Sequence, residues 1–237
     1  MSENNYGFVR VVSAIPELRV ADCTFNALKI EAEIKNASTQ NVSVICFPEL
    51  SITGYTCADL FYQNKLLQDA ETTLLNLMER TKALNIITIV GMPLKYNQEL
   101  FNVAVVFSKN KILGIVPKLT IPNNNEFYEK RWFQSGIGIN ETIEIAGQEV
   151  PFSANTLFQI GQLSFGIEIC EDLWSPIPPS SQLAVEGAKV IFNLSASNEL
   201  VTKHNYRRQL VEQQSARCRC GYVYSSAGFG ESTTDVV

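Results

Sequence analysis

Three polar residues of the sequence stand just after apolar, strand-like runs. They are Glu49 in VSVICFPEL, Lys118 in ILGIVPKL and Cys170 in LSFGIEICEDLW. Sites in α/β folds assemble at the carboxyl ends of strands, so we expect these three side chains to meet at one end of a sheet. A carboxylate, an ammonium and a thiol that meet in one place form a set suited to acyl transfer.

Each of these three groups has a distinct part in acyl transfer. The thiolate of a cysteine is the nucleophile, and it needs a base or a nearby cation. A carboxylate takes the thiol proton and later activates water, while an ammonium stabilises the tetrahedral oxyanion. Spacing alone also allows a structural interpretation, because cysteine is among the most buried residue types. A lone Glu or Lys after proline usually faces solvent, so the local sequence must decide.

The composition argues against several other classes of function. The chain has 237 residues, of which 46% are hydrophobic and 18% charged, and this is typical of a globular protein of one large or two small domains. The net charge of −5, without a basic run, argues against a nucleic-acid partner. No apolar run approaches the roughly 18 residues of a membrane span, and MSENNYGFVRVV does not resemble a signal peptide. We therefore expect a cytoplasmic protein with no membrane partner.

The cysteines and the single histidine restrict the chemistry further. Without an export signal, the six cysteines are expected to be free thiols in a reducing compartment. A zinc site built on several histidines is excluded, since His204 is the one histidine of the chain, and we expect it at the surface. No metal is therefore expected at the site.

Strand-like and helix-like segments alternate along the chain, which predicts an α/β layered fold. A hairpin around Ser108, Lys109 and Asn110 argues against a purely parallel sheet, and residues 120–159 are expected to be rich in loops. The expected strands are 8–15, 42–47, 86–90, 101–107, 111–116, 163–169, 189–194 and 221–226, and the expected helices are 21–34, 66–84, a short one closing over 183–187, and 205–219.

Three segments resemble, in order, the signatures of the nitrilase or carbon–nitrogen hydrolase superfamily: FPELSITGY, PKLTIPNNNEFYEKRWF and GIEICEDLW. The resemblance runs through nearly the whole chain and implies one nitrilase-like domain over residues 1–237. It implies a four-layer αββα sandwich, commonly assembled as a homo-oligomer. It also implies that Glu49 is the base, Lys118 the oxyanion partner and Cys170 the nucleophile. Glu126 matches a second glutamate that supports the site in this superfamily.

Further segments resemble one subgroup, the amino-terminal glutaminase domains of glutamine-dependent NAD synthetases: ICEDLW, NLSASNE, KHNYRRQLVEQQSARCRCGYVY and GFGESTTD. This resemblance implies that Glu171 and Ser197 bind the amino-acid end of glutamine, and Glu126 and Phe127 are expected to contact the substrate as well. An acidic residue beside the nucleophile suits a substrate that carries an ammonium. One departure is Asn124, which stands where the subgroup usually has a tyrosine lining the glutamine pocket.

The expected activity is hydrolysis of the side-chain amide of glutamine, through a Cys170 thioester, to glutamate and ammonia. That reaction needs no cofactor. The ammonia would supply a synthetase domain of the same parent chain, which would use ATP with Mg and is absent from these residues. Two alternatives are a free-standing nitrilase-family amidase for another small amide and a catalytically silent structural domain.

The last residues, GESTTDVV, resemble a turn that leads into a further strand. We therefore expect the domain to be truncated at its carboxyl-terminal end. If so, an exposed strand edge and apolar surface would be left. The chain with its natural continuation would then be more stable and would assemble more completely.

Overall fold

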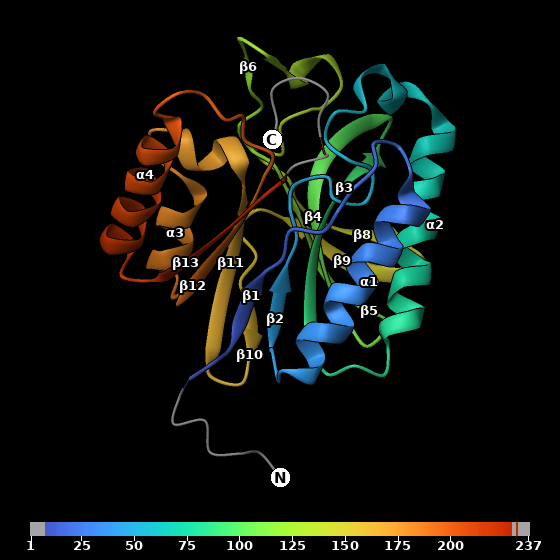
Figure 1. Cartoon of the computed structure of the whole chain (residues 1–237), viewed down its shortest axis with the longest axis horizontal. Helices are drawn as coiled ribbons and strands as arrows, with labels where there is room; N and C mark the ends of the chain where they lie inside the picture. Colours follow the sequence, from blue (N-terminus) through green and yellow to red (C-terminus); the bar gives the residue numbers. More distant parts are fainter. Residues whose placement is uncertain (1–7, 229–230, 232–237) are drawn as a thin grey trace.

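Two β-sheets face each other, and a pair of helices covers the outer side of each (Figure 1). The structure is a computed structural model, and it describes residues 8–228 and residue 231. α1 (Cys23–Thr39) and α2 (Asn64–Thr81) lie on one side, and α3 (Pro179–Val185) and α4 (Lys203–Cys218) lie on the other. This arrangement confirms the expected four-layer αββα sandwich.

The larger sheet has seven strands in the order β1-β2-β3-β4-β5-β9-β8. Its first three strands run parallel, and the remaining neighbours pair antiparallel except β5 with β9. Its strands are β1 (Val11–Ser13), β2 (Val44–Cys46), β3 (Ile87–Tyr96), β4 (Glu99–Ser108), β5 (Lys111–Pro117), β8 (Asn140–Ile145) and β9 (Gln148–Ser153).

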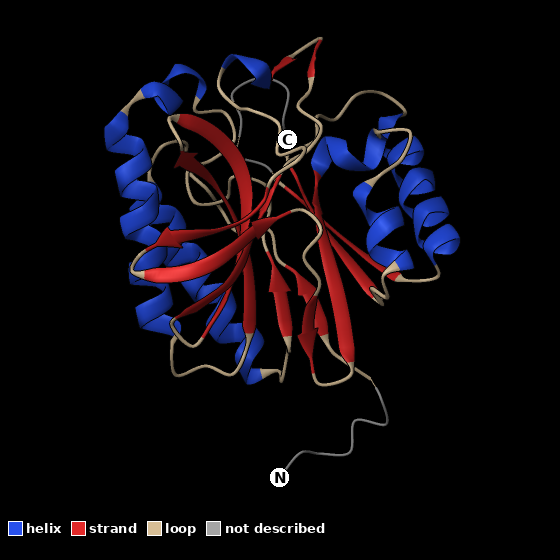
Figure 2. Ribbon diagram, turned by 180° about the vertical axis from the view of Figure 1, so that it is seen from behind, coloured by secondary structure: helices blue, strands red, loops and turns tan. Residues whose placement is uncertain are grey.

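The smaller sheet has four strands in the order β10-β11-β12-β13, and a separate two-stranded ribbon lies at the top of the molecule (Figures 1 and 2). The last three strands of the smaller sheet run parallel to one another. Its strands are β10 (Phe158–Ile160), β11 (Leu163–Ile169), β12 (Val190–Ser195) and β13 (Gly221–Ser226), and the ribbon is β6 (Asn123–Asn124) with β7 (Phe127–Tyr128). Three short 3₁₀ helices are η1 (Ala58–Tyr62), η2 (Glu129–Arg131) and η3 (Cys170–Trp174).

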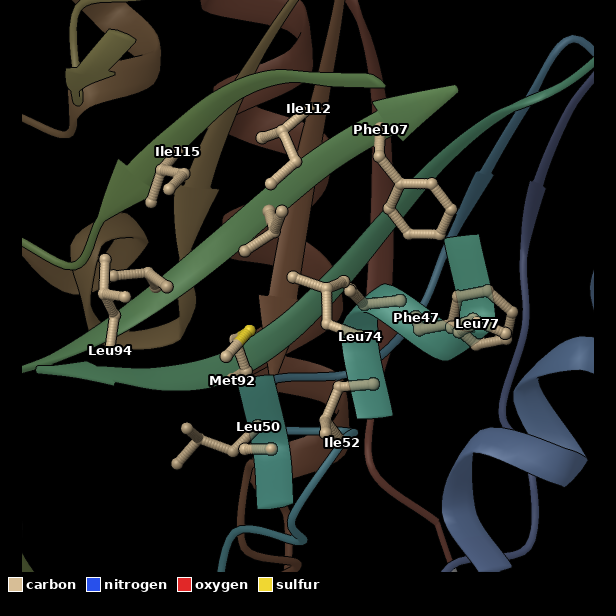
Figure 3. Close-up of a cluster of buried hydrophobic side chains, with 14 of the residues drawn as sticks. Phe47, Leu50, Ile52, Leu74, Leu77, Met92, Leu94, Phe107, Ile112 and Ile115 are labelled. Atoms are coloured by element: carbon tan, nitrogen blue, oxygen red, sulfur yellow. The ribbon is translucent and has the colours of Figure 1, made fainter. Parts of the chain in front are cut away.

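Two hydrophobic layers hold the sandwich together. One lies between α1, α2 and the larger sheet, where Leu74 and Leu77 of α2 lie against Met92 of β3 and against Phe47, which directly follows β2 (Figure 3). Apolar residues of α2 recur every three or four positions, so one stripe of the helix is buried. The second layer lies between the sheets and joins residues such as Val44 and Val106 of the larger sheet to Phe165 and Phe192 of the smaller.

Most of the expected elements are present, and two turns account for the main differences. β3 and β4 are longer than expected because Asn97 and Gln98 both adopt positive φ and form a tight hairpin turn. Positive φ at Ala146 and Gly147 likewise joins β8 to β9, so the expectation that 120–159 is mostly loop was partly wrong. The expected hairpin between β4 and β5 is confirmed, with Lys109 and Asn110 at its turn.

The described residues bear on three other expectations. All six cysteines lie among them and are free thiols. Within 8–228 and 231, no helix has the length and apolar character needed to cross a membrane. The expected turn and strand at the carboxyl-terminal end fall on residues 229–237, which lie outside the described residues except for Glu231.

Candidate active site

Glu49 lies three residues beyond the end of β2, in a tight segment that is packed on β3. Gly91 makes this packing possible, because a Cβ there would collide with the backbone of Leu50. The carboxylate of Glu49 is fully buried. Its Oε1 accepts hydrogen bonds from Lys118 Nζ and Asn102 Nδ2, each at 2.7 Å, and its Oε2 accepts one from the backbone N–H of Ala196 at 3.0 Å.

Lys118 follows the last residue of β5, and its side chain is also fully buried. Its backbone N–H donates to the carbonyl of Asn102 at 2.9 Å, which extends the pairing of β5 with β4 by one residue. The ammonium Nζ lies 2.7 Å from Glu49 Oε1 and 2.7 Å from Glu129 Oε1. A buried cation is thus held between two buried carboxylates.

The second glutamate of the site is Glu129, not Glu126. Glu129 opens η2, and its Oε1 also accepts the hydroxyl proton of Tyr55 at 2.7 Å. Glu126 instead lies in the turn between β6 and β7, where its side chain is partly exposed. Glu126 stands at the turn of the β6–β7 hairpin, whereas Glu129 follows β7 and is buried against Lys118.

The buried charges act strongly on one another. Burial lowers the pKa of Lys118, but the charges of Glu129 and Glu49 outweigh burial and hold this pKa well above its usual value. Burial raises the pKa of Glu129, and the charge of Lys118 opposes that rise. Lys118 therefore stays protonated, and Glu129 is a carboxylate that binds a proton more readily than an exposed glutamate.

Cys170 stands at the point where β11 turns into η3, and its backbone has a φ of +46°. Such a left-handed conformation is unfavourable for a residue with a side chain, and it persists where neighbouring contacts hold it. The backbone N–H of Cys170 donates to Asn193 Oδ1 at 3.3 Å. Burial raises the pKa of the Cys170 thiol, the charge of Glu49 raises it further, and Lys118 lowers it. The three side chains are therefore close enough to act on one another, and the thiol needs a base to ionise.

Asp172 ties the cysteine turn to the segment that follows Lys118. Its Oδ2 accepts the backbone N–H of Ile169 at 3.0 Å, and its Oδ1 accepts those of Leu119 at 3.0 Å and Thr120 at 2.7 Å. Burial raises the pKa of this carboxyl to about 7, although the N–H groups of Thr120 and Ile169 lower it. Asp172 fixes the end of β11 against the end of β5.

We expect Asp172→Asn to destabilise the fold. An amide has one carbonyl oxygen, so it cannot accept on both sides, and at least one buried N–H loses its partner at a cost of about 1–3 kcal/mol. Urea unfolding measures this difference. The matched control is Asp22→Asn, because Asp22 accepts a single N–H at the start of α1 and asparagine caps helices equally well. An unchanged midpoint for Asp172→Asn would contradict this assignment.

A cavity of about 450 Å³ adjoins the cysteine turn. Three of the four residues expected to bind substrate line it: Glu126, Phe127 and Glu171. Ser197 is not in the lining; it is buried, its Oγ accepts from Arg207 Nη1 at 3.1 Å, and its neighbour Asn198 lines the cavity instead. The whole lining is Asn124, Asn125, Glu126, Phe127, Glu171, Trp174, Asn198, Leu200, Val201, Thr202, Lys203 and Tyr206.

Lys203 is a lining residue that the sequence analysis missed. Its Nζ donates to Asn198 Oδ1 and lies 5.2 Å from the ring centre of Trp174 and 5.7 Å from that of Phe127. Burial raises the pKa of Glu171, while the charges of Lys118 and Lys203 lower it. The only sequence signal for Lys203 is its place at the start of a polar helix, where a lysine usually faces solvent. The cavity thus contains both a carboxylate and an ammonium.

The sequence pattern of the carbon–nitrogen hydrolase family matches residues 9–235. The chain belongs to this family. It is therefore a carbon–nitrogen hydrolase, and its αββα sandwich is the fold found in nitrilase-superfamily structures.

Curated relatives of this hydrolase are named glutamine-dependent NAD(+) synthetase. The protein of Mycobacterium tuberculosis is 37% identical over 238 residues, a match that covers 99% of this chain and 35% of the relative. The human protein is 31% identical over 214 residues, covering 82% of this chain and 30% of the relative. The chain thus spans about a third of the length of these relatives.

Solved structures also superimpose on the chain. A glutamine-dependent NAD(+) synthetase from Cytophaga hutchinsonii has a TM-score of 0.83 at 27% identity, covering 92% of this chain and 36% of that one. An amidase from Nesterenkonia sp. AN1 has a TM-score of 0.77 at 16% identity, covering 97% and 82%. The second likeness supports the fold alone.

Proposed function

We propose that this carbon–nitrogen hydrolase cleaves the side-chain amide of glutamine to glutamate and ammonia. The observation that carries the proposal is that Glu171 and Lys203 line one cavity, which adjoins the turn of Cys170. Free glutamine carries an ammonium and a carboxylate at the end remote from its amide. The carboxylate of Glu171 can pair with the former and the ammonium of Lys203 with the latter.

The buried charges supply a route for the reaction. Glu49 takes the proton of the Cys170 thiol, and the thiolate attacks the amide carbon. The ammonium of Lys118 stabilises the oxyanion, while Glu129 keeps that ammonium charged and in place. The proton on Glu49 passes to the leaving nitrogen, so ammonia departs and a Cys170 thioester remains. Glu49 then deprotonates water, which attacks the thioester and releases glutamate.

The names of the relatives support a wider proposal. Because they are named glutamine-dependent NAD(+) synthetase, we propose that the ammonia serves a synthetase domain of the same parent chain. ATP with Mg belongs to that domain, and the glutamine step uses neither. No residue from outside 1–237 enters the proposed glutaminase mechanism.

A substrate series tests the proposal against a free-standing amidase for another small amide. The assay measures ammonia release from glutamine, from glutaramic acid, which lacks the ammonium, and from glutamine α-amide, which lacks the carboxylate. We expect glutamine to have the highest kcat/KM, because either analogue leaves Glu171 or Lys203 without a partner. Equal kcat/KM for all three would indicate a general amidase, and no release from any would indicate a silent domain.

Glu171→Gln is expected to raise the KM for glutamine more than it lowers kcat. The interaction with the ammonium is worth roughly 1.5–3 kcal/mol, which corresponds to about a tenfold to hundredfold change. Steady-state kinetics give both constants. Glutaramic acid is the matched control, because it has no ammonium and its KM should be similar for the wild-type protein and the variant. An unchanged KM for glutamine with a lower kcat would instead assign Glu171 to the reaction itself.

A further inference from the structure

The backbone amide of Cys170 is held by a side chain from the neighbouring strand. Asn193 of β12 accepts this N–H through its Oδ1, and the same oxygen accepts the hydroxyl of Ser195 at 2.8 Å. Asn193 is fully buried and pairs in register with Glu168 of β11. The support of the strained cysteine turn thus depends on which way the Asn193 amide faces.

A hydrogen-bonded chain fixes the orientation of that amide. Asn193 Nδ2 donates to the hydroxyl oxygen of Tyr222 at 3.0 Å, and the Tyr222 hydroxyl donates to Glu168 Oε1. The other oxygen of Glu168, Oε2, accepts the backbone N–H of Ser180 in α3 at 2.8 Å. Glu168 is 1% exposed and lies two residues before Cys170. Neither Glu168 nor Tyr222 has a part in the reaction proposed above.

Which group donates in each of these hydrogen bonds follows from the number of protons that each group can give. The Tyr222 hydroxyl has a single proton, and it donates that proton to Glu168 Oε1. The hydroxyl oxygen must then accept from Asn193, which turns Nδ2 toward Tyr222. Oδ1 is left facing the N–H of Cys170. Glu168 therefore determines which group donates and which accepts in every hydrogen bond between its carboxyl group and the backbone N–H of Cys170.

We propose that Glu168 is a positioning residue that holds the backbone of Cys170 through Tyr222 and Asn193. The inference rests on the proposed role of Cys170 as nucleophile. These hydrogen-bonded side chains lie on the side of the smaller sheet that α3 covers, because Glu168 also accepts the backbone N–H of Ser180 in α3. It therefore supports the cysteine from the opposite side to Asp172, which binds the segment after Lys118.

Glu168→Gln exchanges donors and acceptors along these hydrogen bonds without a large change in side-chain volume. The Gln oxygen is required by the N–H of Ser180, so its Nε2 donor faces Tyr222. The hydroxyl can then donate to Asn193, whose amide turns and presents Nδ2 to the N–H of Cys170, donor against donor. Tyr222→Phe removes the connection entirely. Both variants should leave the substrate cavity intact, since neither residue lines it.

The experiment measures glutamine kcat and KM, and the rate at which iodoacetamide alkylates Cys170, located by peptide mass spectrometry. We expect kcat to fall about tenfold in each variant with KM within twofold, because a misplaced nucleophile slows the chemical step. The alkylation rate of Cys170 should fall by a similar factor. Tyr96→Phe is the matched control, since it removes an exposed Tyr–Glu hydrogen bond, to Glu141, within the larger sheet, and it should leave both rates unchanged.

The double variant separates positioning from general loss of stability. If Glu168 acts through Tyr222, Glu168→Gln with Tyr222→Phe should be no slower than either single variant, whereas independent roles would multiply the two losses. Circular dichroism verifies folding, and Tyr222→Phe, which loses one hydroxyl, carries the test where Glu168→Gln does not fold. Wild-type kcat and alkylation rate in both single variants would overturn the inference, as would multiplied losses. Glutamine hydrolysis by Cys170→Ala would instead overturn the proposed function.

Discussion

Replacing Cys170 with alanine should abolish glutamine hydrolysis while the fold is retained. The thiol is the group that attacks the amide in the proposed reaction, and loss of such a group lowers kcat by more than about a thousandfold. The fold should survive because the change removes one sulfur atom from a turn whose left-handed φ of +46° is as accessible to alanine as to cysteine. Ammonia release measures the activity, and urea unfolding measures the stability.

Two further measurements make the Cys170→Ala result specific. After the wild-type protein is quenched with glutamine present, mass spectrometry should detect a glutamyl adduct on the peptide that contains Cys170. Cys23→Ala is the matched control, because Cys23 is also buried but lies at the start of α1, and its loss should leave kcat unchanged. A Cys170→Ala protein that keeps a substantial part of the rate would show that another group attacks the amide.

The second large effect is expected for Lys118→Met, which should both inactivate and destabilise the protein. Methionine is close to lysine in volume, but it leaves Glu49 and Glu129 buried without a cation. Breaking a buried ion pair in this way costs about 3–5 kcal/mol. The midpoint of urea unfolding should fall accordingly, and glutamine hydrolysis should be lost with the ammonium that stabilises the oxyanion.

The destabilisation by Lys118→Met should depend on pH. Burial already raises the pKa of Glu129, and removal of Lys118 takes away the charge that lowers it. A carboxyl whose pKa is higher in the folded than in the unfolded state loses stability as the pH rises above its unfolded value of about 4.5. The difference in unfolding free energy from wild type should thus be small near pH 4.5 and grow toward pH 8.

A compensating change tests this interpretation of Lys118. In Lys118→Met with Glu129→Gln, one of the two uncompensated charges is gone, so part of the stability should return and the pH dependence should weaken. Activity should stay absent, because the ammonium is still missing. Stability that does not depend on Glu129 would show that Lys118 supports the fold by packing and not by charge.

The sequence predicted the fold closely where hydrophobic patterns were continuous. β11 and β13 have the expected bounds, because a short run of strand-forming residues between two turns leaves little choice of where the strand begins and ends. The hairpin turns at 97–98 and 146–147 were missed, since Asn-Gln and Ala-Gly are weaker signals for two residues of positive φ than Asn-Gly. The lengths of β3, β4, β8 and β9 depended on those turns.

The site was predicted less evenly than the fold. Glu49, Lys118 and Cys170 each follow a strand, and the structure brings them together as expected. The sequence could not show which of Glu126 and Glu129 contacts Lys118. Their positions depend on the β6–β7 ribbon, whose strands have two residues each and no periodic pattern. Lys203 could not be predicted either, since its place in the cavity depends on how α4 packs and not on local sequence.

The residues of the proposed reaction are divided between the two sheets. Glu49 and Lys118 are attached to strands of the larger sheet, whereas Cys170 and the Ala196 N–H that binds Glu49 are attached to strands of the smaller one. Their alignment therefore depends on the apolar layer between the sheets, which contains Phe165 and Phe192. A substitution in that layer that keeps the protein folded can therefore still slide one sheet over the other, separate Glu49 and Lys118 from Cys170, and lower turnover.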